Sequence, residues 1–229
     1  MLFRRLVTFI LITFGTTTLF AQEVNGVGDF KIGMSLEDFL ELPLIKDKNV
    51  QDKASRKYST NESDAWKTTA ESQVNEYERV YSGEVVKFDF ITPLGIPNII
   101  GEDSHKVTTT FYKGKLAKVY IPQVGSEFET VLPAKYGRPI RVDKTKSVTC
   151  QNGYGAKSSH LDGAESTIWG NGKKVTATLK FSFYGCGNGG RSYLVEDGAI
   201  AKVIDRIEAS GRKASEAEEA KLKASASKL

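Results

Sequence analysis

A strict alternation of apolar and polar residues constrains the fold of this chain more than any other feature. In the stretch KVTATLKFSFY, every odd-numbered position from 175 to 183 is apolar and every even-numbered position between them is polar. Successive side chains of a β-strand point to opposite faces, so the pattern predicts a strand that buries one face of a sheet. The preceding segment ESTIW-GNGK, at 165–173, supplies a turn and a partner strand, which together predict a hairpin.

Similar patterns predict further strands on both sides of this hairpin. EVVKFDFI at 84–91 alternates in the same way, and RSYLVED at 191–197 predicts the last strand. KVTTTFYKGKLAKVYIP at 106–122 predicts a second hairpin, with its turn at Lys113-Gly114.

Three segments have the spacing of amphipathic helices. Ser35 and Asp38, in GDFKIGMSLEDFLELP, form a capping box in which each side chain satisfies a free amide of the first turn. Ser126 and Glu129, in SEFETVLPAKYGRP, predict a second capping box of the same kind. DGAIAKVIDRIEA at 197–209 repeats apolar residues at helical spacing and predicts a helix that docks on the core.

The order of these elements predicts an α+β fold, with an antiparallel sheet or sheets, helices packed on one face and a C-terminal helix. The globular domain covers residues 22–208, as one unit or as two tandem helix-plus-sheet modules at 22–122 and 123–208. Residues 44–80 are polar and predict an exposed insertion, either a long loop or a loop with one marginal helix near 62–79. Residues 209–229 predict a flexible helical or disordered tail.

The N-terminal segment has the three parts of a secretory signal peptide. Arg4 and Arg5 precede an apolar run at Leu6–Phe14 that is too short to span a bilayer stably, and Leu19-Phe20-Ala21 is the predicted cleavage site. Cleavage of residues 1–21 predicts a periplasmic or secreted protein without stable membrane insertion, and an uncleaved membrane anchor is the alternative. The remaining chain carries 30 basic and 28 acidic residues, and this near-neutral balance argues against nucleic acid as a partner.

The chain contains two cysteines, Cys150 and Cys186. In an exported protein such a pair predicts a disulfide, because the compartment is oxidising. In the chain-entropy model, a loop of this length gives roughly 4 kcal/mol of stabilisation. The EF-hand, P-loop and dinucleotide motifs are missing from the sequence, so we expect neither a metal nor a cofactor.

Two short motifs resemble segments of small exported bacterial envelope proteins of the β-lactamase-inhibitor-protein-like fold. One is Ile32-Gly33-Met34-Ser35, which opens the first predicted helix. The other is Lys135-Tyr136-Gly137-Arg138-Pro139 with Trp169 later on a strand, and it is similar to a KYGxP…W pattern. The resemblance implies a non-catalytic scaffold whose members bind other proteins.

The loop VTCQNGYGAKSSHLDG, at 148–163, contains the residues that a catalytic function would require. As a hydrolase, the protein would use His160 as the base and Ser158 or Ser159 as the nucleophile, but no G-x-S-x-G motif accompanies them. We favour a non-catalytic module, an adaptor, inhibitor or accessory factor, that binds another envelope or foreign protein. A structural envelope component anchored by residues 1–21 is a third alternative.

Loops on a rigid sheet, and aromatic residues within them, are where binding residues concentrate. The sequence offers such residues in and beside the 44–80 insertion and in the cysteine-stapled loop. The predicted contact residues are Trp66, Tyr77, Tyr81, Tyr154 and His160.

Overall fold

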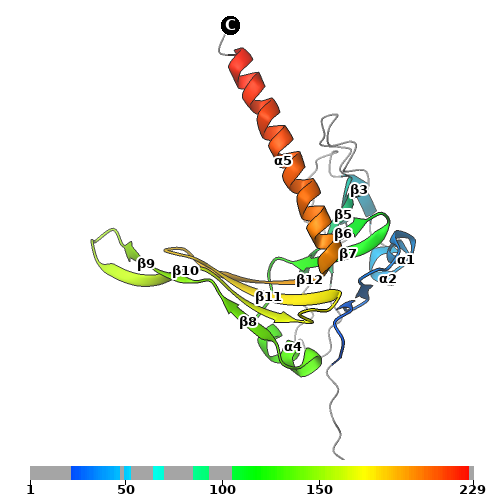
Figure 1. Ribbon diagram of the computed structural model, residues 1–229, viewed down its shortest axis with the longest axis horizontal. Coiled ribbons are helices and arrows are strands. Elements are labelled where there is room, and N and C mark those ends of the chain that lie inside the picture. Colours follow the sequence, from blue (N-terminus) through cyan, green and yellow to red (C-terminus); the bar gives the residue numbers. More distant parts are fainter. Residues whose placement is uncertain (1–21, 47–48, 53–63, 70–84, 93–104, 227–229) are drawn as a thin grey trace, which may run out of the picture.

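The computed structural model describes residues 22–46, 49–52, 64–69, 85–92 and 105–226 of the chain (Figure 1). The helices are α1 (Leu36–Leu40), α2 (Pro43–Lys46), α4 (Phe128–Tyr136) and α5 (Gly198–Ala226). Two short strands, β1 (Gly26–Val27) and β2 (Phe30–Lys31), pair antiparallel near the N-terminus. The other described strands are β3 (Asn49–Asp52), β4 (Asp64–Thr69), β5 (Val85–Thr92), β6 (His105–Tyr112), β7 (Lys115–Ile121), β8 (Ile140–Asp143), β9 (Lys146–Gln151), β10 (Lys157–Trp169), β11 (Val175–Tyr184) and β12 (Gly190–Asp197).

The strands from β3 to β12 form one sheet, in the order β3-β4-β5-β6-β7-β12-β11-β10-β8, with β9 also paired to β10. All described pairs are antiparallel except β3 with β4. The α+β class, the antiparallel sheet and the C-terminal helix are therefore confirmed. Strands from both predicted modules, 22–122 and 123–208, meet where β7 pairs with β12, for example at Val119 and Val195.

The larger hydrophobic core lies between this sheet and the short helices. Ser35 caps α1 as predicted: the Asp38 amide donates to Ser35 Oγ (3.0 Å), which itself donates to the Asp38 carboxylate (2.7 Å). The cap directs Phe39 into the core, where it is fully buried. Phe128 and Leu132 of α4 belong to the same core, so α1, α2 and α4 cover one face of the sheet.

The second predicted capping box is wrong. Helix α4 begins at Phe128, and no side chain caps it. The carboxylate of Glu129, which was expected to complete the box with Ser126, instead accepts a hydrogen bond from Arg191 Nε on β12 (2.6 Å). A charged partner on the sheet takes the place of a free amide, because a hydrogen bond between two charged groups is the stronger interaction.

Helix α5 packs on the opposite face of the sheet. It begins directly after β12, and the buried carboxylate of Asp197 accepts hydrogen bonds from the amides of Ala199 and Ile200 (3.0 and 3.1 Å). Ile204 then packs in a small separate cluster with Val85 and Ala117. Val85 can reach this cluster because it points away from the face that carries the larger core.

Two ion pairs extend the contact between α5 and the sheet. Lys118 Nζ lies 2.6 Å from Asp205, and Lys87 Nζ lies 2.6 Å from Glu208. A bulge opposite Thr110 brings Ala117 and Lys118 to the same face, which explains how one short stretch of β7 serves both the apolar cluster and an ion pair.

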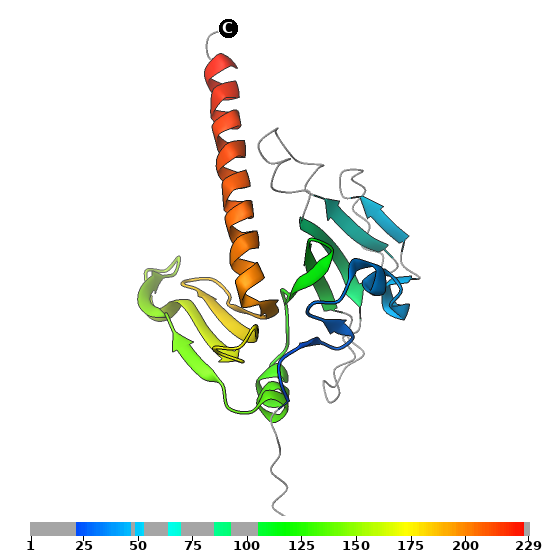
Figure 2. The same ribbon diagram turned by 45° about the vertical axis from the view of Figure 1, so that its right-hand side comes forward.

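Two segments differ in detail from the expectations. Within 44–80, the described residues form α2, β3 and β4, so residues 64–69 are a strand where a marginal helix was expected. The expected tail 209–229 is helical as far as Ala226 and continues α5 without interruption. Its described side chains are largely exposed, and Figures 1 and 2 show this end of the helix extending away from the sheet.

The carboxylate of Glu196, on β12 beside α5, should make the stability pH-dependent. Burial raises the pKa of Glu196 above its ordinary value of 4.5, Lys118 acts against this shift, and Asp205 adds to it. The folded protein therefore binds this proton more tightly than the unfolded chain, and the stability that it contributes is lost as pH rises through the raised pKa.

Glu196→Gln keeps the neutral form at every pH, so the variant should gain stability relative to the wild type as pH rises above about 4.5. Urea unfolding of both proteins between pH 4 and pH 7 measures this difference. Glu216→Gln, on an exposed part of α5, controls for the loss of one negative charge. A difference for Glu196→Gln that stays constant over this range would contradict the prediction.

Candidate functional site

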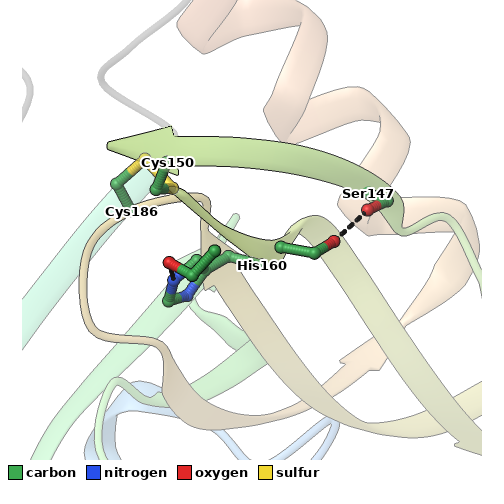
Figure 3. The surroundings of a disulfide bond; sticks show 6 residues. Ser147, Cys150, His160 and Cys186 are labelled. Atoms are coloured by element: carbon green, nitrogen blue, oxygen red, sulfur yellow. Dashed lines mark hydrogen bonds between the residues drawn. A yellow bond between two sulfur atoms is a disulfide. The ribbon is translucent and has the colours of Figure 1, made fainter. Parts of the chain in front are cut away.

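The predicted disulfide between Cys150 and Cys186 is present, with a distance of 5.5 Å between the two Cα atoms (Figure 3). Cys150 lies near the end of β9, and Cys186 lies in the turn between β11 and β12. The bond therefore ties the long β9–β10 hairpin to its neighbouring turn. As an oxidised pair, it is compatible with an exported location.

His160 and Ser158 lie on the same face of β10, and Ser158 Oγ is 2.7 Å from His160 Nε2. Ser159 points to the other face, where its hydroxyl is 2.6 Å from that of Ser147 (Figure 3). Of the two candidate nucleophiles, the structure thus places Ser158 beside the histidine and Ser159 away from it.

No carboxylate of the described residues pairs with His160 as the third group of a catalytic triad. Asp162 is the next residue on the same face, and its carboxylate pairs with Lys146 Nζ at 3.3 Å. Ser158 and His160 are both exposed on the strand. The pair has hydrogen-bond geometry for proton transfer, but within the described part of the chain no carboxylate orients His160 as a triad requires.

The other predicted contact residues are spread over the molecule. Tyr154 lies at the tip of the β9–β10 hairpin and is 98% exposed, in a turn that the Asn152 side chain organises by accepting from the amides of Tyr154 and Ala156. Trp66 lies on β4, opposite Gln51 and Asp89, toward the other end of the sheet. Tyr77 and Tyr81 lie outside the described residues. Of the predicted contact residues that the structure describes, Tyr154 and His160 therefore lie on the same hairpin and Trp66 lies apart from them.

A groove that the sequence did not reveal lies on the α4 side of the sheet. It has a volume of about 660 Å³ and runs between α4 and the strands β8, β10, β11 and β12. We call it the α4 groove. Its lining residues are Glu129, Pro133, Pro139, Arg141, Val142, Asp143, Glu165, Ser166, Thr167, Trp169, Leu179, Phe181, Phe183 and Arg191.

Two phenylalanines give the groove its apolar surface. The rings of Phe181 and Phe183 have their centroids 4.3 Å apart in an edge-to-face arrangement, and neither residue is fully buried. Leu161, 43% exposed, projects from β10 on the same side as Phe183 and extends the apolar surface toward the hairpin. Partly buried aromatic rings of this kind are typical of surfaces that bind other proteins.

A fixed arginine borders these rings. The guanidinium of Arg191 lies 4.6 Å from the centroid of the Phe181 ring, while its Nε donates to Glu129 at 2.6 Å. Stacking on one side and pairing on the other hold the guanidinium in one orientation. Arginine and aromatic residues together are enriched among the residues that dominate binding energy at protein interfaces.

Carboxylates form the other border of the groove. Asp143 and Glu165 are direct cross-strand partners on β8 and β10, on the face that also carries Phe181. The amide and hydroxyl of Thr145 both donate to Asp143 (2.8 Å each) and lower its pKa, so this carboxylate stays charged. Like charges directly opposite each other destabilise a sheet, so this pair does not contribute to the stability of the fold.

The sequence contained only a partial signal for the groove. The odd-numbered positions of 175–183 predict one buried face, yet the core ends after Leu179 and leaves Phe181 and Phe183 in contact with solvent. The cause is the shortness of α4, nine residues that do not reach the far end of the strand. The sequence signal for the groove is that the apolar positions at 175–183 extend further than a helix as short as α4 can cover.

Comparison with known proteins gives no relative for this chain. No protein-family model, curated protein sequence or solved structure matches it. Among the described residues, no three His, Cys, Asp or Glu side chains gather as a metal site would require. None of the described helices combines the length and the apolar character needed to cross a bilayer. The geometry above is therefore the basis for assigning a function.

Proposed function

We propose that the protein is an exported, non-catalytic module that binds another envelope or foreign protein through the α4 groove. The observation that carries the proposal is the pair Phe181 and Phe183, left partly exposed beside an oriented Arg191. An adaptor, an inhibitor or an accessory factor would all use such a surface. The resemblance to β-lactamase-inhibitor-protein-like proteins supports the same class of function.

Rigidity of the groove supports this proposal. Its floor is a sheet, one wall is α4, and the disulfide fixes the adjoining β9–β10 hairpin to the β11–β12 turn. A preorganised surface loses little conformational entropy when a partner binds. Export through residues 1–21, followed by cleavage after Ala21, would deliver the protein to a periplasmic or extracellular partner.

Phe183→Ala should reduce capture of the partner at least about tenfold, because truncation of an aromatic hot-spot residue costs about 2 kcal/mol or more of binding energy, and about 1.4 kcal/mol corresponds to tenfold. The experiment uses the chain exported by its own N-terminal segment and tagged at the C-terminus. It is crosslinked in an envelope extract of the producing organism, and captured proteins are quantified by mass spectrometry. The mass of the recovered protein also reports whether residues 1–21 were removed, and fractionation tests the alternative of an anchored structural component.

Tyr184→Ala is the matched control, since Tyr184 neighbours Phe183 but projects from the opposite face of β11 and is 65% exposed. The proposal predicts a saturable partner that is lost with Phe183→Ala and kept with Tyr184→Ala. Loss with Tyr154→Ala or His160→Ala instead would move the binding site to the hairpin. Equal capture by all variants would contradict binding through the groove.

A hydrolase is the second candidate, because Ser158 Oγ lies within hydrogen-bond distance of His160 Nε2. In this function, His160 would take the proton of Ser158 as the hydroxyl attacks an ester or amide. Screening of the purified protein against ester and peptide substrates tests it, with His160→Ala as the control. An activity that is lost in this variant while the fold is retained would favour the hydrolase over the binding module.

A further inference from the structure

Strand β8 forms one edge of the described sheet. It pairs with β10 on one side, and no described strand pairs with it on the other. The amide of Lys144, directly after β8, donates to the Ala164 carbonyl on β10 (2.9 Å). Main-chain groups alternate in direction along an antiparallel strand, so those of Arg141 and Asp143 point away from β10. This edge therefore offers two N–H and two C=O groups to another strand.

The edge carries an excess of positive charge. Four of the nine residues at 138–146 are basic and exposed, whereas Asp143 is the single acidic one. Lys146 pairs with Asp162 at 3.3 Å. Arg138, Arg141 and Lys144 form no ion pair with any acidic residue that the structure describes.

These charges select among the chains that could pair with this edge. Residues 138–146 carry four basic residues and one acidic residue, so the same edges of two copies would each bring a net positive charge, and this net repulsion opposes their pairing even where Arg141 lies opposite Asp143 of the copy. They attract an extended segment that carries Asp or Glu, by the electrostatic complementarity that sets partner choice at interfaces. The net charge therefore disfavours a second copy of this edge and favours an acidic partner.

We propose that the edge of β8 binds an extended acidic segment of the partner protein as an additional strand. This inference rests on the proposed binding function, because the α4 groove begins at β8 with Pro139 and Arg141. An added strand would form main-chain hydrogen bonds with Arg141 and Asp143. Its alternate side chains would lie on the α4 side, where Arg141 can pair with a carboxylate at the mouth of the groove.

Arg141→Pro is the most direct test. Proline at 141 removes one outward N–H and leaves the pairing of β8 with β10 intact, because that N–H is not part of the β8–β10 ladder. The probe is an eight-residue capped peptide of alternating Thr and Glu, and its comparison is the same peptide with Lys in place of Glu. Titrations of the full chain followed by amide chemical shifts detect weak binding and identify the residues affected.

The acidic peptide should bind at least about tenfold more tightly than the basic one and shift the amides of residues 138–146. Arg141→Pro should weaken binding by about tenfold, and Arg141→Ala, which keeps the N–H, by a smaller factor. If Arg141→Pro lowers the melting temperature, the exposed double reversal Arg138→Glu with Lys144→Glu replaces it and should reverse the preference between the peptides.

Three results would overturn this inference. The first is equal binding of both peptides, and the second is chemical-shift changes outside residues 138–146. The third is binding of a single-stranded DNA of eight nucleotides to the same residues as tightly as the acidic peptide. The last result would show attraction of any polyanion in place of strand addition.

The proposed function is tested separately by partner capture. A partner lost with Phe183→Ala but kept with Arg141→Pro would leave the groove proposal standing and refute strand addition. A partner kept with both variants would refute binding through the α4 groove as well as strand addition.

Discussion

Replacing both Cys150 and Cys186 by serine is expected to lower the free energy of unfolding by about 4 kcal/mol. The bond joins residues 36 positions apart, and opening it frees this long loop in the unfolded chain. The closed loop contains the whole of β10 and β11, two strands of the sheet. In the folded protein, the pairing of these strands brings the two cysteines together. Urea unfolding of the oxidised protein and the double variant measures the difference.

Reductant provides the matching control for this prediction. The wild-type protein in reductant should approach the stability of the double-serine variant, and the variant itself should be insensitive to reductant. Ser147→Ala, which changes a hydroxyl contact on the same hairpin without touching the disulfide, should have a much smaller effect. Unchanged stability of the wild type in reductant would show that the bond adds little to the folded state.

Phe39→Ala is expected to cost about 3–5 kcal/mol, because truncation of a fully buried aromatic ring removes apolar contacts and leaves a cavity. The Phe39 ring lies 4.9 Å from that of Phe111, 5.2 Å from that of Phe88 and 6.0 Å from that of Phe30, measured between centroids. This one ring therefore connects α1 with β2, β5 and β6. Urea unfolding, monitored by circular dichroism, measures the loss.

Leu40→Ala is the matched control for this prediction. It makes the same kind of truncation one residue later in α1, but Leu40 is 37% exposed and lies outside the core. We expect a loss of well under half that of Phe39→Ala, because a partly exposed side chain removes less surface from water. Equal losses for the two variants would mean that α1 contributes through its helix propensity and not through the aromatic contacts.

Periodicity and cysteine count predicted much of the fold. The alternation at 175–183 identified β11, the Lys113-Gly114 turn identified the β6–β7 hairpin, and the two cysteines identified the disulfide. Both residues of that turn have positive φ (50° and 72°), the backbone conformation that suits a tight two-residue hairpin. The alternation and the turn are local signals, since they depend on a few neighbouring residues, whereas the disulfide was predictable because the chain has two cysteines.

Features that depend on distant residues were not predictable in the same way. Glu129 has the spacing of a capping residue, and only the position of Arg191, 62 residues later in the chain, shows that it pairs with the sheet instead. The α4 groove exists because a short helix meets a longer strand, a relation between separate parts of the chain. Likewise, nothing in the sequence around His160 indicates that the Asp162 carboxylate forms an ion pair with Lys146.

The position of β12 in the sheet has a consequence for how the chain folds. This last strand lies in the middle, between β7 and β11, so Tyr193 pairs with Ile121 on one side and with Leu179 on the other. Until residues 190–197 are available, both neighbours keep an open edge, and neither half can complete its share of the core. Contacts between such distant residues form slowly, because the intervening chain must first be ordered. A chain built in this way completes the core of its sheet only after β12 has been inserted between β7 and β11.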